Sequence, residues 1–287
     1  MDFRALYQSE NLYNHGIPLQ AQWDTTSFSF PAFASMTQLS FSDFLGTAPG
    51  RALLGWESVQ FDEMVQDAFG FEALQVGCPR LDTLKANRIV SHWLTDADAD
   101  ALTGIGLRDD LQRVQAESGW LPFASESLDL VTLPHTLDFA ASPHQTLREA
   151  ARVLVPEGRL ILTAFNPLSL WWLRQRSVSL GLRPYLPSKT VPISLYRLKD
   201  WLQLLGFEID RGRFGLYEPP CRTASGLARW KWMNKAGDRW APHCANLVML
   251  SAVKRLPGTT LVGRVPIRRA AGAFAAGPAV SVSREAR

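Results

Sequence analysis

Two residues that could take part in chemistry follow strand-like segments of the sequence. His135 comes just after the apolar run 128–133, and a histidine titrates near neutral pH, so it can take a proton from a hydroxyl, an amine or a carbon acid. The alternative is a histidine that only shapes a pocket wall. Gly77 ends the run 73–77, where the missing Cβ lets the backbone approach a ligand closely. The two positions predict a small-molecule site.

Two further residues are candidates for a substrate pocket. Asn166 follows the apolar run 159–165, and Trp171 lies in a predicted helix over 168–176. The amide of Asn166 could line the pocket, or it could belong to a turn before the helix. Trp171 could form part of an apolar lid, although an aromatic side chain in a helix is more often part of a core.

Strand-like runs alternate with helical segments along most of the chain. Helices are predicted over 50–69, from Ser142 to the turn at Pro156, and over 194–206. This alternation predicts an α/β fold, a Rossmann-like, doubly wound and mostly parallel sheet of about seven strands with helices on both faces. Its ligand site should lie at the carboxyl ends of the strands. The strands are expected at 73–77, 88–93, 111–116, 128–133, 159–165, 207–217 and 245–256.

The composition predicts one folded domain between two extensions. We expect an N-terminal extension over 1–50, partly disordered, a folded domain over 51–256, and a basic low-complexity tail over 257–287. Seven basic residues and one acid lie between 254 and 287, so this segment carries a formal charge of +6. Such a tail can contact nucleic acid or an anionic membrane, or remain solvated and disordered.

The compartment is predicted from what the sequence lacks. Its three cysteines are too few and too scattered for a disulfide framework or a zinc site. The first residues do not have the basic and apolar pattern of a secretory signal. No apolar run approaches the roughly 20 residues that cross a bilayer. We therefore expect a cytoplasmic protein without a membrane span and without a bound metal.

Residues 117–158 contain six sequence elements in a fixed order. The elements are Glu117, Leu121-Pro122-Phe123, Asp129, His135, a helix with Arg148-Glu149 and Arg152-Val153-Leu154, and Pro156-Glu157-Gly158. Together they resemble the core of class I S-adenosylmethionine-dependent methyltransferases of the type 11, ubiquinone/menaquinone branch. Six elements in register are far harder to meet by accident than one short motif.

The resemblance implies S-adenosyl-L-methionine as the cofactor and an unidentified acceptor, expected to be a small molecule. By this resemblance, Glu117 accepts a hydrogen bond from the adenine amino group, and the backbone N–H of Ser118 faces the ring. Leu133, at the end of the fourth predicted strand, is expected to line the cofactor site. His135 then lies near the sulfonium and the acceptor, where it is the candidate catalytic residue.

The sequence departs from the family pattern at two positions. The family loop that begins at Gly77 holds the amino-acid end of the cofactor and continues with two more glycines, whereas this chain has Cys78, Pro79 and Arg80. Either Arg80 pairs with the cofactor carboxylate, or the altered loop excludes the cofactor. The family has an acid that binds the ribose at the end of the second strand, but here the first acid, Asp96, comes three residues after the predicted strand end at 93. Asp96 either binds the ribose or is a solvated turn residue.

Three functions remain open on this reading. The first is methyl transfer, which depends mainly on holding two reactants in line. The second is a catalytically silent binding or regulatory protein on the same fold, because a fold does not fix a function. The third and weaker one is RNA binding or RNA methylation, suggested by the basic tail and by tryptophans interleaved with basic residues over 217–242. An amphipathic helix over the acceptor pocket is the simpler account of that insertion.

Overall fold

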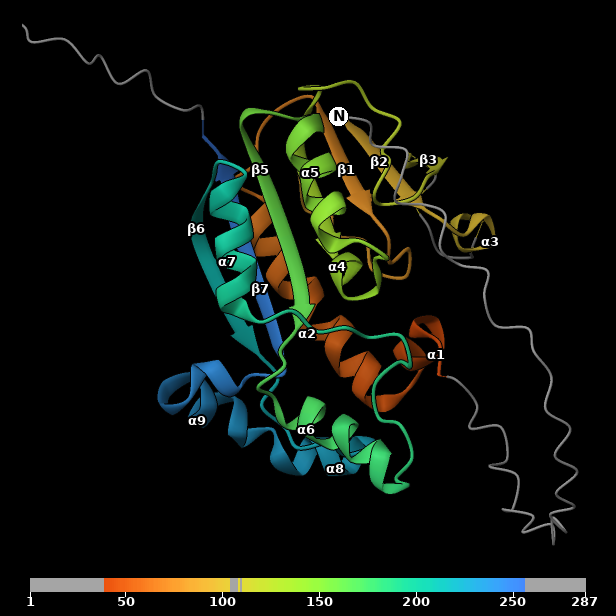
Figure 1. Cartoon of the computed structure of the whole chain (residues 1–287), viewed down its shortest axis with the longest axis vertical. Helices are drawn as coiled ribbons and strands as arrows, with labels where there is room; N and C mark the ends of the chain where they lie inside the picture. The colour runs from red at the N-terminus through yellow and green to blue at the C-terminus, as the bar shows by residue number, and fades with distance from the viewer. Residues whose placement is uncertain (1–38, 104–107, 109, 256–287) are drawn as a thin grey trace, which may run out of the picture.

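The computed structural model describes residues 39–103, 108 and 110–255, which build one seven-stranded sheet (Figure 1). The strand order is β3-β2-β1-β4-β5-β7-β6. Strand β7 runs antiparallel to β5 and β6, and the other described neighbours are parallel. The predicted doubly wound α/β fold is confirmed. The strands are β1 (Glu72–Val76), β2 (Ser91–Asp96), β3 (Gln112–Gln115), β4 (Leu128–Pro134), β5 (Leu154–Phe165), β6 (Phe207–Gly215) and β7 (Leu247–Lys254).

Helices cover both faces of this sheet, and each face has its own apolar core. Helix α2 (Ala48–Val65) packs on one face through residues such as Phe61, against Leu130 and Ile161 of the central strands. Helices α5 (Pro143–Val153) and α7 (Leu195–Leu204) cover the other face. The remaining helices are α1 (Phe41–Gly46), α3 (Ala99–Leu102), α4 (Thr136–Phe139), α6 (Leu170–Arg176), α8 (Ala224–Trp230) and α9 (Trp232–Trp240), with 3-10 turns η1 (Ser177–Leu180) and η2 (Pro242–Cys244).

The strand register brings three loops to one edge of the sheet. Val76 at the end of β1 pairs with Thr95 in β2. Gln75 pairs with Thr132 in β4, two residues before β4 ends. Because the carboxyl ends of parallel strands share an edge, the loops after β1, β2 and β4 converge there.

Strand β2 lies three residues further along the chain than the predicted 88–93. Asn87 explains the difference, because its side-chain amide donates to the carbonyls of Val65 and Ala68 at the end of α2, and its Oδ1 accepts from the N–H of Ile89. These bonds hold the chain in a turn, so pairing with β1 begins at Ser91. The correction makes Asp96 the last residue of the strand.

The predicted boundary between residues 50 and 51 falls inside α2. Ser40 caps α1, since its Oγ accepts from the N–H of Asp43 at 3.0 Å, and the Thr47 hydroxyl caps α2 in the same way. Phe44 and Leu45 of α1 are buried in the core. Residues 39–50 therefore belong to the folded domain, whereas the rest of the predicted extension and the tail over 257–287 lie outside the described residues.

The insertion after β6 forms two short helices instead of the single amphipathic helix expected. Helices α8 and α9 are separated at Lys231, and together with α6 they lie at the lower end of the molecule in Figure 1. Within the described ranges, no helix has both the length and the apolar content needed to cross a bilayer.

Candidate active site

A crevice of about 950 Å³ opens at the carboxyl edge of the sheet, within the size range of small-molecule sites. The ends of β1, β2 and β4 and the loop after β3 form one side. Helix α1 and the segment 187–189 contribute another wall, and the N–H of Ser188 donates to the carbonyl of Leu39 at 3.1 Å. Of the predicted site residues, the crevice is lined by Gly77, Asp96, Ser118 and His135.

The loop that departs from the family pattern leaves the crevice open. Gly77 has a φ of 77° and Cys78 a φ of 50°, and the left-handed region favours glycine at the first of these positions. Pro79 lines the crevice without filling it. Nη1 of Arg80 donates to the carbonyl of Ser42 at 2.7 Å. This bond ties Arg80 to α1, so its guanidinium helps to build the wall.

Gln75, which was not predicted as a site residue, holds this loop in place by hydrogen bonds from inside the sheet. Its Nε2 donates to the carbonyls of Gly77, Cys78 and Leu81, at 2.7 to 3.1 Å. Its Oε1 accepts from the N–H and the hydroxyl of Thr83. Because Gln75 is buried, these bonds form away from water, where leaving them unmade is costly.

Asp96 lies at the rim of the crevice, directly at the end of β2. Its Oδ1 accepts from the N–H of Asp98 at 2.9 Å, and its own carbonyl accepts from the N–H of Ala116. Burial raises the pKa of the Asp96 carboxyl, although the backbone N–H donors oppose the rise. An acid in this position is available to a ligand bound across β1 and β2.

His135 lies on the crevice floor between two carboxylates. The residue is fully buried and has a φ of 55°. Its Nδ1 lies 2.7 Å from Oδ2 of Asp138, and its Nε2 lies 3.0 Å from Oε1 of Glu57 on α2. Oδ2 of Asp138 also accepts from the N–H of Phe165, whose ring lies 4.3 Å from the imidazole, centroid to centroid. Both ring nitrogens of His135 therefore have acidic partners.

The two carboxylates decide the protonation of His135. Burial on its own lowers the pKa of the imidazole, but the charge of nearby Glu57 and the hydrogen bond and charge of Asp138 outweigh it and raise the pKa to about 9. Burial also raises the pKa of the Asp138 carboxyl, against the opposing effect of His135. At neutral pH the imidazole thus holds its proton, between the two buried carboxyl groups. His135 is therefore not a free base in this geometry.

Two residues predicted to bind cofactor are not among those that line the crevice. The Glu117 side chain is exposed and does not line it, while the neighbouring Ser118 does and holds its hydroxyl 3.1 Å from that of Thr146. Leu133 packs in the core under α5 and α7. The alternation of side chains along β4 turns Leu133 into that core, and Pro134 lines the crevice in its place.

The residues predicted for the substrate pocket are structural instead. Nδ2 of Asn166 donates to the carbonyls of His243 and Ala245, and its Oδ1 accepts from the N–H of Leu168. Trp171 is fully buried, and its Nε1 donates to the carbonyl of Glu218 at 2.9 Å. Both side chains join the chain after β5 to the insertion after β6, so neither forms a lid over the crevice.

Glu57 and Asp138 were not predicted, although the sequence carries a signal for each. Glu57 falls on the apolar face of its helix, between Leu53 and Phe61 at spacings of four residues. A charged residue at such a position is rarely buried unless it is paired. Asp138 lies three residues after His135, and α4 brings its carboxylate back to the imidazole. Gln75 similarly interrupts an apolar strand.

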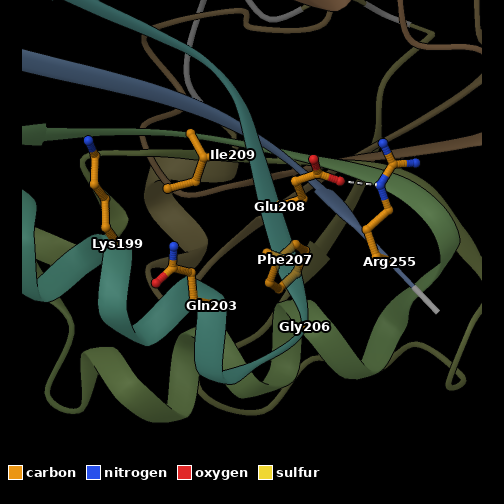
Figure 2. A pocket seen from close by; sticks show the side chains of 7 residues that line it. All are labelled: Lys199, Gln203, Gly206, Phe207, Glu208, Ile209 and Arg255. Carbon is orange, nitrogen blue, oxygen red and sulfur yellow. Dashed lines mark hydrogen bonds and ion pairs between the residues drawn. The ribbon is translucent and has the colours of Figure 1, made fainter. Parts of the chain in front are cut away.

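A second hollow, of about 560 Å³, lies at the opposite edge of the sheet (Figure 2). It is formed where β6 begins and β7 ends, with Lys199 and Gln203 of α7 beside it. Figure 2 shows the Glu208 carboxylate directed at Arg255, and the two are 2.7 Å apart. This edge holds the amino ends of the parallel strands, where α/β folds do not place their ligands. The first crevice is therefore the candidate active site.

Part of the chain that forms the crevice is similar to known proteins. Residues 80–162 match the family model of the type 11 methyltransferase domain. The matched stretch contains β2 to β4 and most of β5, and it begins just after Pro79. Gly77 and Cys78 therefore lie before it.

Two curated relatives and one solved structure are similar to the chain. The uncharacterized protein YafS of Escherichia coli is 43% identical over 97 residues, which are 34% of this chain and 40% of YafS. The ubiquinone/menaquinone biosynthesis C-methyltransferase UbiE of Hahella chejuensis is 39% identical over 61 residues, 21% of this chain and 24% of UbiE. A SAM-dependent methyltransferase of Thermotoga maritima superposes with a TM-score of 0.52 at 15% identity, over 75% of this chain and 94% of that one.

Proposed function

Because this chain belongs to the type 11 branch of the class I S-adenosylmethionine-dependent methyltransferases, we propose that it binds S-adenosyl-L-methionine in the crevice and methylates a small-molecule acceptor there. The observation that carries the proposal is the open crevice at the carboxyl edge of β1, β2 and β4. The altered loop lines this space without filling it.

The residues present fit such a cofactor. Gly77 offers backbone without a side chain at the end of β1, and Asp96 offers a carboxylate at the end of β2, which suits hydroxyl groups of a ribose. Ser118 also lines the crevice and would lie beside the adenine of such a cofactor. The cofactor supplies an activated methyl group on a sulfonium.

The acceptor end of the crevice is assigned to the space beside His135. Phe41 of α1 lies there with its ring 5.5 Å from the imidazole and 4.6 Å from the ring of Phe139. These aromatic walls exclude water and orient an apolar part of the acceptor. The main contribution of the protein is then alignment of two reactants, and the protonated His135 holds a charge beneath them. The role of His135 as a base stays a prediction, since it requires loss of the proton that Glu57 and Asp138 stabilise.

Calorimetric titration tests the proposal. We expect the chain to bind S-adenosylmethionine and S-adenosylhomocysteine. Asp96→Asn should lower the affinity for each ligand by about tenfold or more, which corresponds to about 1.4 kcal/mol of binding free energy. Asp110→Asn is the matched control, because Asp110 is exposed before β3 at the other edge of the sheet. Absence of heat at about millimolar ligand would remove the assignment.

A silent, cofactor-binding regulatory protein is the second candidate. Its support is the pairing of both His135 ring nitrogens, together with Cys78 and Pro79 in the cofactor loop. Incubation of cell extract with methyl-labelled cofactor separates the two functions. Labelled product that depends on the protein establishes turnover, whereas tight binding without product favours the silent protein.

A further inference from the structure

Helix α6 and the 3-10 turn after it expose a row of leucines. Trp171 is buried, while Leu170, Leu173 and Leu180 are 38, 62 and 82% exposed. The first two are one helical turn apart, and Leu180 follows at the end of η1. Exposed aliphatic side chains of this size, close together along the chain, indicate an interaction surface.

Helix α9 exposes tryptophan and basic side chains on its outer face. Asn234 and Gly237 face inward, because the Asn234 carboxamide accepts from the N–H of Tyr217 and Gly237 packs against the same ring. On the other side Trp232 is 61% exposed and Trp240 is 82% exposed. Lys235 and Arg239, three and seven residues after Trp232, are exposed as well. Two tryptophans and two basic residues therefore share the exposed side of α9.

The leucine and tryptophan helices are parts of one layer. The indole of Trp171 donates to the carbonyl of Glu218, and the hydroxyl of Tyr185 donates to the carbonyl of Cys221 at 3.0 Å. Arg222 then bonds back to the carbonyl of Pro184. In Figure 1 this layer forms the lower end of the molecule. We name its exposed Leu170, Leu173, Leu180, Trp232 and Trp240 the Leu/Trp surface.

The charge of this layer is strongly positive. Residues 166–191 contain four basic residues and no acid, and residues 221–243 contain five basic residues and one acid. The two segments together carry a formal charge of +8, while the whole chain carries +3. The excess is local, and it is separate from the basic tail.

We propose that the Leu/Trp surface docks the protein on an anionic lipid bilayer. Leucine and tryptophan side chains insert at the boundary between headgroups and acyl chains, and the neighbouring arginines and lysines reach anionic lipid phosphates. RNA fits this surface less well, because bases stack on tryptophan but not on aliphatic side chains. Exposed Leu173 and Leu180 therefore favour lipid.

Vesicle cosedimentation with the full chain tests the docking. We expect binding to vesicles of phosphatidylcholine with about a third phosphatidylglycerol, and at least about tenfold weaker binding to phosphatidylcholine alone or at raised salt. A variant with Leu173→Ser, Leu180→Ser and Trp232→Ser should lose about tenfold or more of the binding to anionic vesicles. Residues 257–287 are kept in every protein, so the charge of the tail is constant.

The control variant carries Phe71→Ser and Val90→Ser. Both residues are 80% or more exposed and precede β1 and β2 at the opposite edge of the sheet, so this variant should bind vesicles like the parent. Far-UV circular dichroism and thermal unfolding verify that both variants fold. Docking on lipid is overturned if anionic vesicles do not bind at low salt, or if the triple variant binds them as well as the parent. Polyuridine binding that needs Trp232, without vesicle binding, would show RNA to be the partner.

Discussion

The buried pair of His135 and Glu57 predicts a specific pH dependence of stability. The pKa of His135 is raised in the folded protein, from its ordinary 6.5 to about 9. Between these values the folded chain keeps a proton that the unfolded chain releases. The stabilisation is therefore complete below about pH 6.5 and is lost as the pH rises through about 9.

The size of the effect follows from the same two pKa values. At about 1.4 kcal/mol per pKa unit, the rise from 6.5 to about 9 corresponds to about 3 kcal/mol. His135 is fully buried, so solvent screening does not reduce this figure. Replacing Glu57 by glutamine removes one of the two carboxylates and should abolish a large part of the pH-dependent loss.

Urea denaturation at a series of pH values from about 6 to about 9 measures the effect. The free energy of unfolding of the parent should fall across this range, and that of Glu57→Gln should fall much less. Glu63→Gln on the exposed side of the same helix is the matched control and should follow the parent. Burial and the charge of Glu57 also raise the pKa of the Cys78 thiol above its ordinary 9.0, so the thiol stays protonated in both the folded and the unfolded chain over most of this range and adds little to the slope. Equal slopes for the parent and Glu57→Gln, or stability that increases with pH, would refute the reasoning.

Further predictions concern the loop after β1. Gln75→Leu leaves buried carbonyls without donors and should lower the free energy of unfolding, measured by urea denaturation, by about 3 kcal/mol. The same variant should bind S-adenosylhomocysteine more weakly in calorimetry. Gly77→Ala should cost about 1 to 2 kcal/mol because of its φ of 77°, while the new Cβ meets Thr136 Oγ1 at a tolerable 3.4 Å; an unchanged melting temperature would contradict this. Iodoacetamide followed by mass spectrometry should label exposed Cys244 well before buried Cys78, and equal rates would contradict the burial.

The fold could be predicted because turn and capping residues mark where the strands and helices begin and end. Apolar runs separated by capped helices fix a parallel sheet, and the order of the sheet then places Gly77, Ser118 and His135 at one edge. Asp96 was uncertain only because the turn at Asn87 depends on α2 carbonyls, which no local pattern reveals. The turn at Asn87 therefore determines that β2 ends at Asp96.

The environment of the site could not be predicted in the same way. The pairing of His135 with Glu57 joins the loop after β4 to a helix that precedes β1. The sequence allowed Trp171 to be part of a lid or part of the core. The structure places it in the core, where its indole donates to the carbonyl of Glu218, 47 residues along the chain. Such choices are made by tertiary contacts, so periodicity alone leaves them open.

The wall of the crevice is contributed by α1 and the segment 187–189, and both lie outside the 80–162 stretch that matches the family model. Relatives that share this stretch can therefore differ in the side chains that meet an acceptor. On the proposed function, exchange of residues 39–45 and 187–189 between such relatives would transfer acceptor preference, while the part of the crevice at Gly77, Asp96 and Ser118 stays unchanged. Acceptor selectivity could then change in evolution without any change in residues 80–162, the stretch that matches the family model.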